Sequence, residues 1–349
     1  MNITHLPEEI LIKIFGQLST FEILRRIPIV CKKFYTISKV PSLISEIKFI
    51  DHPFDKNTVD FSVLTGIKKL IIQGRFDVDN LIYNAIVNCP KLYHLEIKDC
   101  PLTQEAFTTL IYSDLKLQIL NFDSLHHVIG IQKITTLKSL RYLKLHNLAQ
   151  STPILGNMGN LYERDILNSN DLIKISQNCI KLEGLSINDE YHDLTTNFTE
   201  ESINILLEAR QNTLTELQLV RKANSLSNQA FQNLSNCHHM RVLQLGYTFH
   251  LDEILAKTIS SLHNLETLQL TFVRHVTEEN YVQMFNNKSL QMLVHLDLTG
   301  CFKISNDVIK SIALNCPRLE CLIIKDCPKC WTDKGLEIIP LNCPARWIL

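Results

Sequence analysis

The sequence NCPKLYHLEIKDCP at residues 88–101 returns almost unchanged as NCPRLECLIIKDCP at residues 315–328. Weaker copies along the chain share the frame LxxLxL, with apolar residues at positions one, four and six. The first residues of the copies, here called the frame markers, are Ile44, Ile67, Leu92, Leu117, Leu140, Leu182, Leu214, Met240, Leu265, Leu293 and Leu319. Apart from two longer gaps, neighbouring markers lie about 23 to 28 residues apart, the length of a repeat with one strand and one helix.

Residues 293–316 show the physical logic of one repeat. Leu296 and Leu298 alternate with polar neighbours, as a strand with one buried face requires. A helix capped by Ser305 or Asn306 then places its apolar residues on one face. One strand and one helix cannot bury these faces alone, so neighbouring repeats must stack. The predicted fold class is α/β: a curved solenoid with a parallel sheet on the concave face and helices on the convex face.

Residues 44–349 resemble the cysteine-containing subclass of leucine-rich repeats, especially in WTDKGLEIIPLNCP at residues 331–344. Eight cysteines recur at fixed places beside the predicted strands: Cys89, Cys179, Cys237, Cys316 and Cys343 before them, and Cys100, Cys301 and Cys327 after them. Recurrence of this kind indicates buried packing, because cysteine is small and weakly polar. The chain has eleven cysteines, an odd number, and its start does not read as a secretory signal. We therefore expect reduced thiols in an intracellular protein, cytoplasmic or nuclear.

The first fifty residues carry another pattern. An apolar stripe at helical spacing follows Pro7, a residue suited to a helix start: Ile10, Leu11, Ile14, Phe15 and Leu18. A second short helix is predicted before Pro28 and a third within residues 29–40. Three small helices form a marginal domain if left alone, so this segment is expected to need a partner.

This N-terminal string resembles the F-box. LPEEILIKIFGQL at residues 6–18, IVCKKFYTIS at 29–38 and PSLISEIKF at 41–49 follow that family's order, although Phe34 and Ile44 replace residues that are often Trp. The resemblance implies an F-box at residues 1–43 and a solenoid of about eleven repeats at residues 44–349. It implies that an apolar surface binds the Skp adaptor of SCF (Skp-cullin-F-box) ubiquitin ligases, and through it the cullin and RING subunits. The implied adaptor-binding residues are Leu6, Pro7, Ile10, Leu11, Ile14, Phe15, Leu18, Val30 and Phe34.

The combination of the two resemblances implies the substrate-recognition subunit of such a ligase, which directs a protein substrate to ubiquitination and proteasomal degradation. The alternative is a non-ligase scaffold whose N-terminal helices only cap the solenoid. The sequence has no GxSxG, Walker, HExxH or Gly-rich dinucleotide motif. No catalytic residue, cofactor or metal site is therefore predicted, and the chain is expected not to be an enzyme.

The substrate surface follows from the frame, because positions three, five and seven of each copy point away from the core. The predicted substrate-binding residues at these positions are Lys69, His94, Glu96, Lys98, Tyr142, Lys144, His146, Gln218, Gln244, Gln269, His295, Asp297 and Lys325. The whole chain contains 35 Lys and Arg residues and 36 Asp and Glu residues. This balance favours a protein ligand over nucleic acid or an acidic membrane, both of which select a basic surface, and no stretch is apolar for long enough to span a bilayer.

Four weaker features remain open. The CxxC at Cys327–Cys330, with Cys321 and Cys343 nearby, has the residue types of a zinc or redox site, although repeat packing explains two of these thiols. The adjacent pairs His126–His127 and His238–His239 are unsuited to joint metal ligation on a strand. Residues near 148–168 form an insertion that either binds a partner or is merely tolerated. Basic residues just past the strands are suited to an acidic or phosphorylated substrate: Arg221, Lys222, Arg274 and Lys303.

Overall fold

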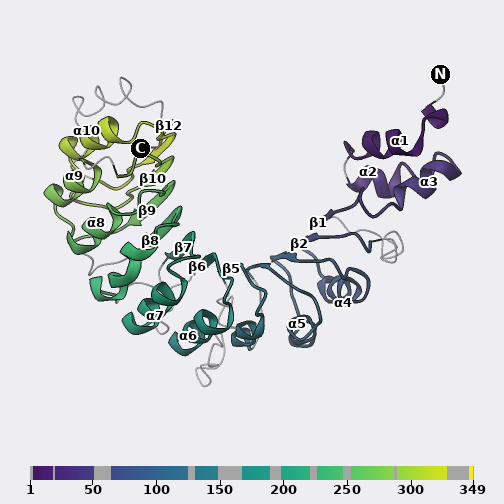
Figure 1. The fold of residues 1–349 in the computed structure, drawn as a ribbon, viewed down its shortest axis with the longest axis horizontal. Helices are drawn as coiled ribbons and strands as arrows, with labels where there is room; N and C mark the ends of the chain where they lie inside the picture. Colours follow the sequence, from purple (N-terminus) through teal and green to yellow (C-terminus); the bar gives the residue numbers. More distant parts are fainter. Residues whose placement is uncertain are drawn as a thin grey trace, which may run out of the picture. The chain divides into compact units, whose positions relative to one another are not determined.

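The computed structural model describes residues 3–18, 20–50, 64–124, 130–147, 167–188, 198–220, 226–246, 253–286 and 289–327, with the backbone of residues 346–348. The chain forms two compact units, one of Met1–Lys133 with Leu148–Asp165 and one of Ile134–Asn147 with Ile166–Leu349. In each unit, parallel strands stack side by side with helices along one side of them (Figure 1). The predicted α/β repeat architecture is confirmed.

The first unit begins with helices and continues as strand–helix repeats. A 3-10 helix, η1 (Ile3–His5), precedes α1 (Glu8–Phe15), α2 (Thr20–Arg25) and α3 (Lys32–Ser38). The repeats comprise β1 (Glu46–Ile50), β2 (Lys69–Gln73), α4 (Val78–Asn88), β3 (His94–Lys98), α5 (Gln104–Ile111) and β4 (Ile119–Asp123). These four strands pair in chain order, so that Glu46 lies opposite Lys69 and Lys69 lies opposite His94.

The second unit continues the same pattern after the 3-10 helix η3 (Ile131–Thr136). Its strands are β5 (Tyr142–His146), β6 (Gly184–Asn188), β7 (Glu216–Val220), β8 (Val242–Gly246), β9 (Thr267–Thr271), β10 (His295–Asp297), β11 (Cys321–Ile323) and β12 (Arg346–Ile348), all parallel to their neighbours. Its helices are α6 (Ser169–Asn178), α7 (Glu200–Arg210), the 3-10 helix η4 (Asn228–Asn236), α8 (Glu253–Ile259), α9 (Glu278–Asn286) and α10 (Asn306–Asn315). The sequence predicts one helix in each repeat. In two repeats this helix is a 3-10 helix, η3 and η4.

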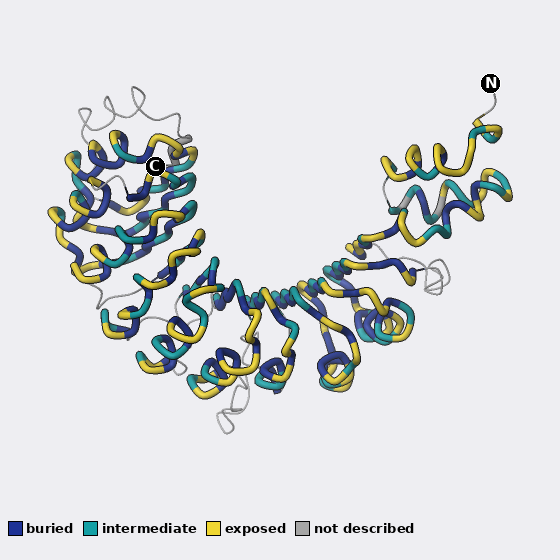
Figure 2. The backbone as a smooth tube through the Cα atoms, in the orientation of Figure 1, coloured by how far each residue is buried: buried dark blue, intermediate teal, exposed yellow. Residues whose placement is uncertain are grey.

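The frame markers form the core beneath the start of each strand. All eleven, from Ile44 to Leu319, are at most 1% exposed. Each strand from β1 to β11 begins two residues after its marker. The strands are mostly buried or half-buried, whereas the helices carry buried and exposed residues on different sides (Figure 2). One apolar frame therefore sets both the strand register and the interior packing.

A residue with a left-handed backbone follows the strand at frame position eight in the repeats where this position is described. Wherever this position is described beyond β1, its φ is positive, and the residues are Gly74, Asp99, Ser124, Asn147, Phe272, Gly300 and Asp326. The left-handed backbone turns the chain away from the sheet, at a cost that only glycine avoids. Position nine then places a buried cysteine under the turn in three repeats: Cys100, Cys301 and Cys327.

Four further cysteines of the repeats close helices. Cys89, Cys179, Cys237 and Cys316 are the C-terminal cap residues of α4, α6, η4 and α10, and all four are buried. The Sγ atom of Cys179 donates to the carbonyl oxygen of Leu137 at 3.4 Å, and that of Cys301 donates to the carbonyl oxygen of Leu270 at 3.0 Å. These thiols are buried, as their recurrence predicted, and the two hydrogen bonds join neighbouring repeats.

Several predictions fall outside the described residues. These are the insertion near 148–168 up to residue 166, the pair His126–His127, the basic residues Arg221 and Lys222, and the thiols Cys330 and Cys343. In the part of the chain that the structure describes, no helix is both long and apolar enough to cross a bilayer.

Candidate functional site

The N-terminal helices have a core of their own. Leu11 and Phe15 of α1 are buried against Phe34 and Ile37 of α3. The rings of Phe15 and Phe34 meet edge to face, with centroids 4.9 Å apart and planes at 78°. Leu6 and Leu18 are half-buried and pack against this cluster. The structure thus places Leu11, Phe15 and Phe34, predicted as adaptor contacts, inside the helical cluster, where they hold α1 to α3.

The other predicted adaptor residues lie on the surface. Ile10 is 42% exposed, Ile14 39% and Val30 58%, and Pro7 is exposed as well. Pro7, Ile10 and Ile14 are spaced to share one face of α1. Val30 lies in the turn before α3, because that helix starts only at Lys32. Sequence reasoning missed the neighbouring Ile29, which is 82% exposed.

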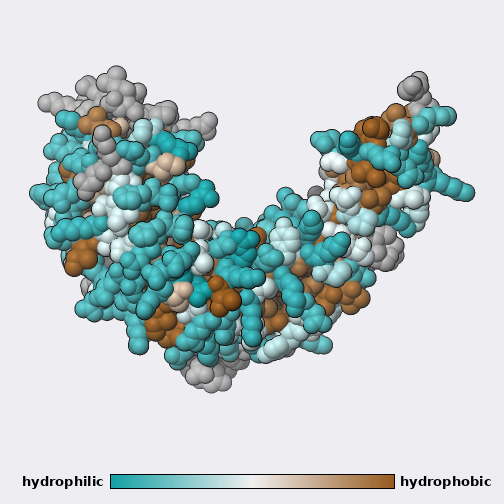
Figure 3. Space-filling model, viewed as in Figure 1, coloured by the Kyte–Doolittle hydropathy of each residue, from teal (hydrophilic) through white to brown (hydrophobic). Residues whose placement is uncertain are grey.

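Hydrophobic side chains gather over these helices, as Figure 3 shows. Polar contacts hold the helices in place. The Nζ atom of Lys33 in α3 donates to the carbonyl oxygens of Thr4 at 3.1 Å and Leu6 at 2.6 Å. The Oγ1 atom of Thr20 donates to the carbonyl oxygen of Glu46 at 2.7 Å, which ties α2 to β1. The exposed apolar side chains are therefore presented on an ordered support.

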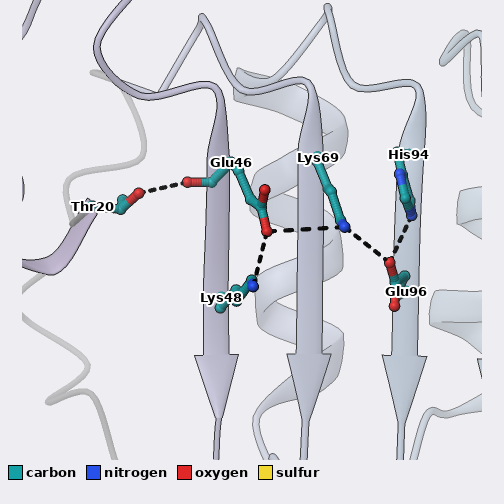
Figure 4. A network of polar contacts seen from close by, with 6 residues as sticks. All are labelled: Thr20, Glu46, Lys48, Lys69, His94 and Glu96. Atoms are coloured by element: carbon teal, nitrogen blue, oxygen red, sulfur yellow. Dashed lines mark hydrogen bonds and ion pairs between the residues drawn. The ribbon is translucent and has the colours of Figure 1, made fainter. Parts of the chain in front are cut away.

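The sheet face opposite the helices, here called the open face, carries an ion-pair network in the first unit (Figure 4). Lys69 of β2 lies between two carboxylates, with its Nζ atom 3.9 Å from Glu46 and 3.3 Å from Glu96. Lys48 pairs with Glu46 at 3.2 Å, and His94 contacts Glu96 at 2.7 Å. The predicted residues Lys69, His94 and Glu96 are thus brought together, and their charges are largely neutralised by one another.

His94 has an altered proton affinity in this network. Burial lowers its pKa, and the positive charge of Lys69 lowers it further, while Glu96 and Glu46 act in the opposite direction. Lys98, at the far end of β3, is more exposed and lies 3.7 Å from Asp123 of β4. Three of the four lysines predicted on the open face therefore have a carboxylate partner: Lys69, Lys98 and Lys144.

The open face of β5 to β7 in the second unit is a hydrogen-bonded network. Lys144 pairs with Glu216 at 2.8 Å, and Glu216 accepts a hydrogen bond from the amide of Gln218 at 2.5 Å. Gln218 in turn accepts from the hydroxyl of Ser186 at 2.8 Å, and Nε2 of His146 lies 2.6 Å from that hydroxyl oxygen. Because the hydroxyl proton is directed to Gln218, His146 must donate from Nε2. Tyr142 packs beside this network, over Gly184.

From β8 onward the open face loses most of its charge. Gln218, Gln244 and Gln269 occupy matching register positions on β7, β8 and β9. Asp297 follows on β10 and accepts hydrogen bonds from the backbone and hydroxyl of Thr299. His295 is half-buried and Lys325 is exposed beyond β11. The predicted substrate residues on β2 to β7 are thus largely paired with neighbouring side chains, those on β8 and β9 are neutral, and charge returns at Asp297 and Lys325.

Sequence reasoning missed a groove of 440 Å³ in the second unit, beside the starts of the strands from β6 to β10. Its lining residues are Glu183, Asn212, Thr213, Thr215, His239, Arg241, Asn264, Glu266 and Met292. Frame position two is occupied by Glu183, Thr215, Arg241 and Glu266. This position is not apolar, so the apolar frame did not point to the groove. The available signal was charge, because Arg241 and Glu266 have opposite sign at this position in consecutive repeats.

Several thiols of the repeats have raised pKa values. Burial raises the pKa of Cys89, Cys179 and Cys237 to about 11 and that of Cys301 to about 12. Cys327 donates to the carbonyl oxygen of Leu298 at 3.2 Å. Thiolates are the form that binds metals and attacks substrates, so these groups are poorly suited to either role. Within the described ranges, no three His, Cys, Asp or Glu side chains cluster in a way that could hold a metal ion.

The basic residues past the strands are only partly described. The guanidinium of Arg274 lies over the ring of Phe302, with its Cζ atom 5.9 Å from the centroid. The pKa of the Glu279 carboxyl is lowered, mainly by the hydrogen bonds that it accepts. The positive charge of Lys303 lowers this pKa further.

Comparison with known proteins gives a family match at the N-terminus. Residues 3–49 match the family model described as F-box-like. The chain joins an F-box-like segment to a leucine-rich-repeat-like fold. None of the curated proteins matches its sequence. The match includes the buried core of the F-box-like segment and the exposed apolar residues Ile10, Ile14 and Val30.

Two solved structures are similar over most of the chain. One is from a crystal structure of the Rad7 and Elc1 complex in yeast, with a TM-score of 0.55, 16% identity and coverage of 94% of this chain and 88% of that one. The other is an internalin (inlF) from Listeria monocytogenes, with a TM-score of 0.46, 15% identity and coverage of 99% and 98%. At this level of identity the first likeness supports the repeat fold alone.

Proposed function

We propose that this chain is the substrate-recognition subunit of an SCF-type ubiquitin ligase. The F-box-like segment binds a Skp adaptor, which connects the chain to cullin and RING subunits, and the open sheet face holds a protein substrate for ubiquitination. The likeness to a chain from the Rad7 and Elc1 complex supports an architecture compatible with assembly into complexes. The chain itself supplies proximity to chemistry carried out by other subunits, and needs no catalytic residue of its own.

The observation that carries the proposal is the exposure of Ile10, Ile14 and Val30 beside a core that is already complete. Leu11, Phe15 and Phe34 close the helical cluster without them. Exposed apolar side chains gathered on an ordered support are typical of a protein-binding surface. If the helices only capped the solenoid, their apolar residues would be expected to face the first repeat.

Co-purification with a recombinant Skp adaptor tests this function. The variant Ile10→Asp/Ile14→Asp changes exposed side chains, so its circular dichroism spectrum is expected to stay unchanged while adaptor binding falls at least tenfold. Ile180→Asp is the matched control, since Ile180 is 60% exposed in the second unit, and it is expected to bind like the unmodified chain. Equal binding by all three proteins, or no binding by the folded unmodified chain, would favour the non-ligase scaffold.

A further inference from the structure

The groove beside the strand starts in the second unit has its charges balanced internally. Arg241 and Glu266 form a two-pronged pair, with Nε and Nη2 of Arg241 at 3.0 and 2.8 Å from Oε1 and Nη2 at 2.8 Å from Oε2. Arg141 holds Glu183 in the same way, at 2.8 Å for both contacts. Each guanidinium thus already binds a carboxylate along one edge. A phosphate entering between these two pairs would meet two carboxylates whose guanidinium partners are already bound, which disfavours an anionic ligand there.

The backbone of the groove is also occupied. The carbonyl oxygen of Glu183 accepts from the amides of Thr215 and Glu216, and that of Thr215 accepts from Arg241 and Val242. The Oγ1 atom of Thr215 also donates to the carbonyl oxygen of Glu183, at 3.0 Å. A ligand must therefore be recognised by the remaining side-chain groups.

Those remaining groups include side-chain amides and the imidazole of His239. Nδ2 of Asn264 donates to the carbonyl oxygen of His238 at 2.8 Å, which leaves its Oδ1 as an acceptor. Asn212 and His239 are exposed at the groove and have no side-chain hydrogen bond to another described residue. The adjoining open face of β8 and β9 adds the half-buried amides of Gln244 and Gln269, which likewise have none within the described part of the chain.

We propose that this groove binds an extended, uncharged and unphosphorylated peptide segment of the protein substrate. A side-chain amide has the donor and acceptor pattern of a peptide group, so Asn212, Asn264 and the glutamine pair can hydrogen-bond a peptide backbone without a charged partner. The groove follows successive strand starts, and Gln244 and Gln269 lie in the middle of β8 and β9, so the groups are spread across neighbouring strands, which fits an extended chain. This inference rests on the proposed function and specifies its substrate class.

The test uses the full chain and a bead library of random dodecapeptides, half of the beads carrying phosphoserine in place of serine. Beads that retain the chain are expected to carry peptides of zero net charge, and phosphoserine beads are expected to be depleted at least tenfold. Asn212→Ala/Asn264→Ala is expected to weaken binding of the selected peptides at least tenfold. Asn170→Ala, at an exposed position on α6 outside the groove, is the matched control and is expected to change binding less than twofold.

Enrichment of phosphoserine or strongly charged peptides, retention of no peptide, or equal binding by the double variant would each overturn the inference. Adaptor co-purification is measured on the same proteins. If the adaptor binds but the groove variants behave like the unmodified chain, the peptide site is wrong and the ligase function stands. If the adaptor does not bind while peptides still bind in the groove, the proposed ligase function is wrong and the peptide site stands.

Discussion

The edge-to-face contact between Phe15 and Phe34, with ring centroids 4.9 Å apart, divides the apolar residues of the F-box-like segment into two groups. Residues at this contact are interior, whereas Ile10 and Ile14 on the same helix are exposed. Two substitutions of similar chemistry should therefore have different consequences, one for stability and one for binding.

Phe34→Ala is expected to destabilise the three-helix segment by about 3–5 kcal/mol, because it removes a buried ring and leaves a cavity. Amide hydrogen exchange should show loss of protection across α1 and α3. Ile14→Ala is the control, with a change of about 0.5 kcal/mol or less expected at an exposed site. Unchanged protection in Phe34→Ala would contradict the contact with Phe15.

Gly300 combines a left-handed backbone with a neighbouring aromatic ring that leaves no room for a side chain. Its φ is +70°, and an added Cβ atom would lie 2.5 Å from Cδ1 of Phe272. Gly300→Ala is expected to cost about 1–3 kcal/mol through backbone strain and this clash, and to lower the midpoint of urea denaturation. Asp99 has the same frame position and a φ of 51° but already carries a side chain. Asp99→Gly should change the free energy of unfolding by less than about 1 kcal/mol. A larger loss for Asp99→Gly than for Gly300→Ala would contradict the clash between residue 300 and Phe272.

The buried thiols predict a loss of stability at alkaline pH. Burial raises the pKa of Cys237 from 9.0 to about 11, so the folded state favours the protonated thiol. This contribution is fully present below pH 9, where the unfolded thiol is also protonated, and is lost as the pH rises from 9 to about 11. The loss is on the order of 3 kcal/mol for Cys237.

Cys237→Ser separates this effect from other groups that titrate in the same range, because serine does not ionise there. The difference in unfolding free energy between the variant and the unmodified chain should narrow as the pH rises from 9 to 11. Urea denaturation of both proteins at several pH values measures this difference in unfolding free energy. A constant difference would mean that Cys237 is not buried as the structure has it.

The frame markers explain why so much of the fold could be predicted. Leu92 and Leu319 lie in nearly identical strings, and an apolar residue at the same place in every repeat has only the core to occupy. Strand starts follow at a fixed offset, so the outward positions were also predictable. The left-handed residue at position eight was not, because Phe272 and Ser124 give no local signal for positive φ.

The functional surfaces were less predictable for a physical reason. The apolar stripe of α1 is wider than one helix face, so periodicity cannot separate buried Leu11 and Phe15 from exposed Ile10 and Ile14. Which side is covered depends on where α3 packs, a tertiary property. Similarly, the list of outward residues did not show that Lys69 is neutralised by carboxylates on both neighbouring strands.

The network around Lys69 predicts opposite pKa changes from two substitutions. Lys69→Met keeps the aliphatic side chain but removes the charge that lowers the pKa of His94, so this pKa should rise. Glu96→Gln removes the carboxylate that raises it, so the pKa should fall. NMR titration of the His94 imidazole measures both, with Lys91→Met, at an exposed residue before β3, as the control. Opposite shifts are expected only if the three side chains share one network in solution; shifts of the same sign, or none, would show that they do not.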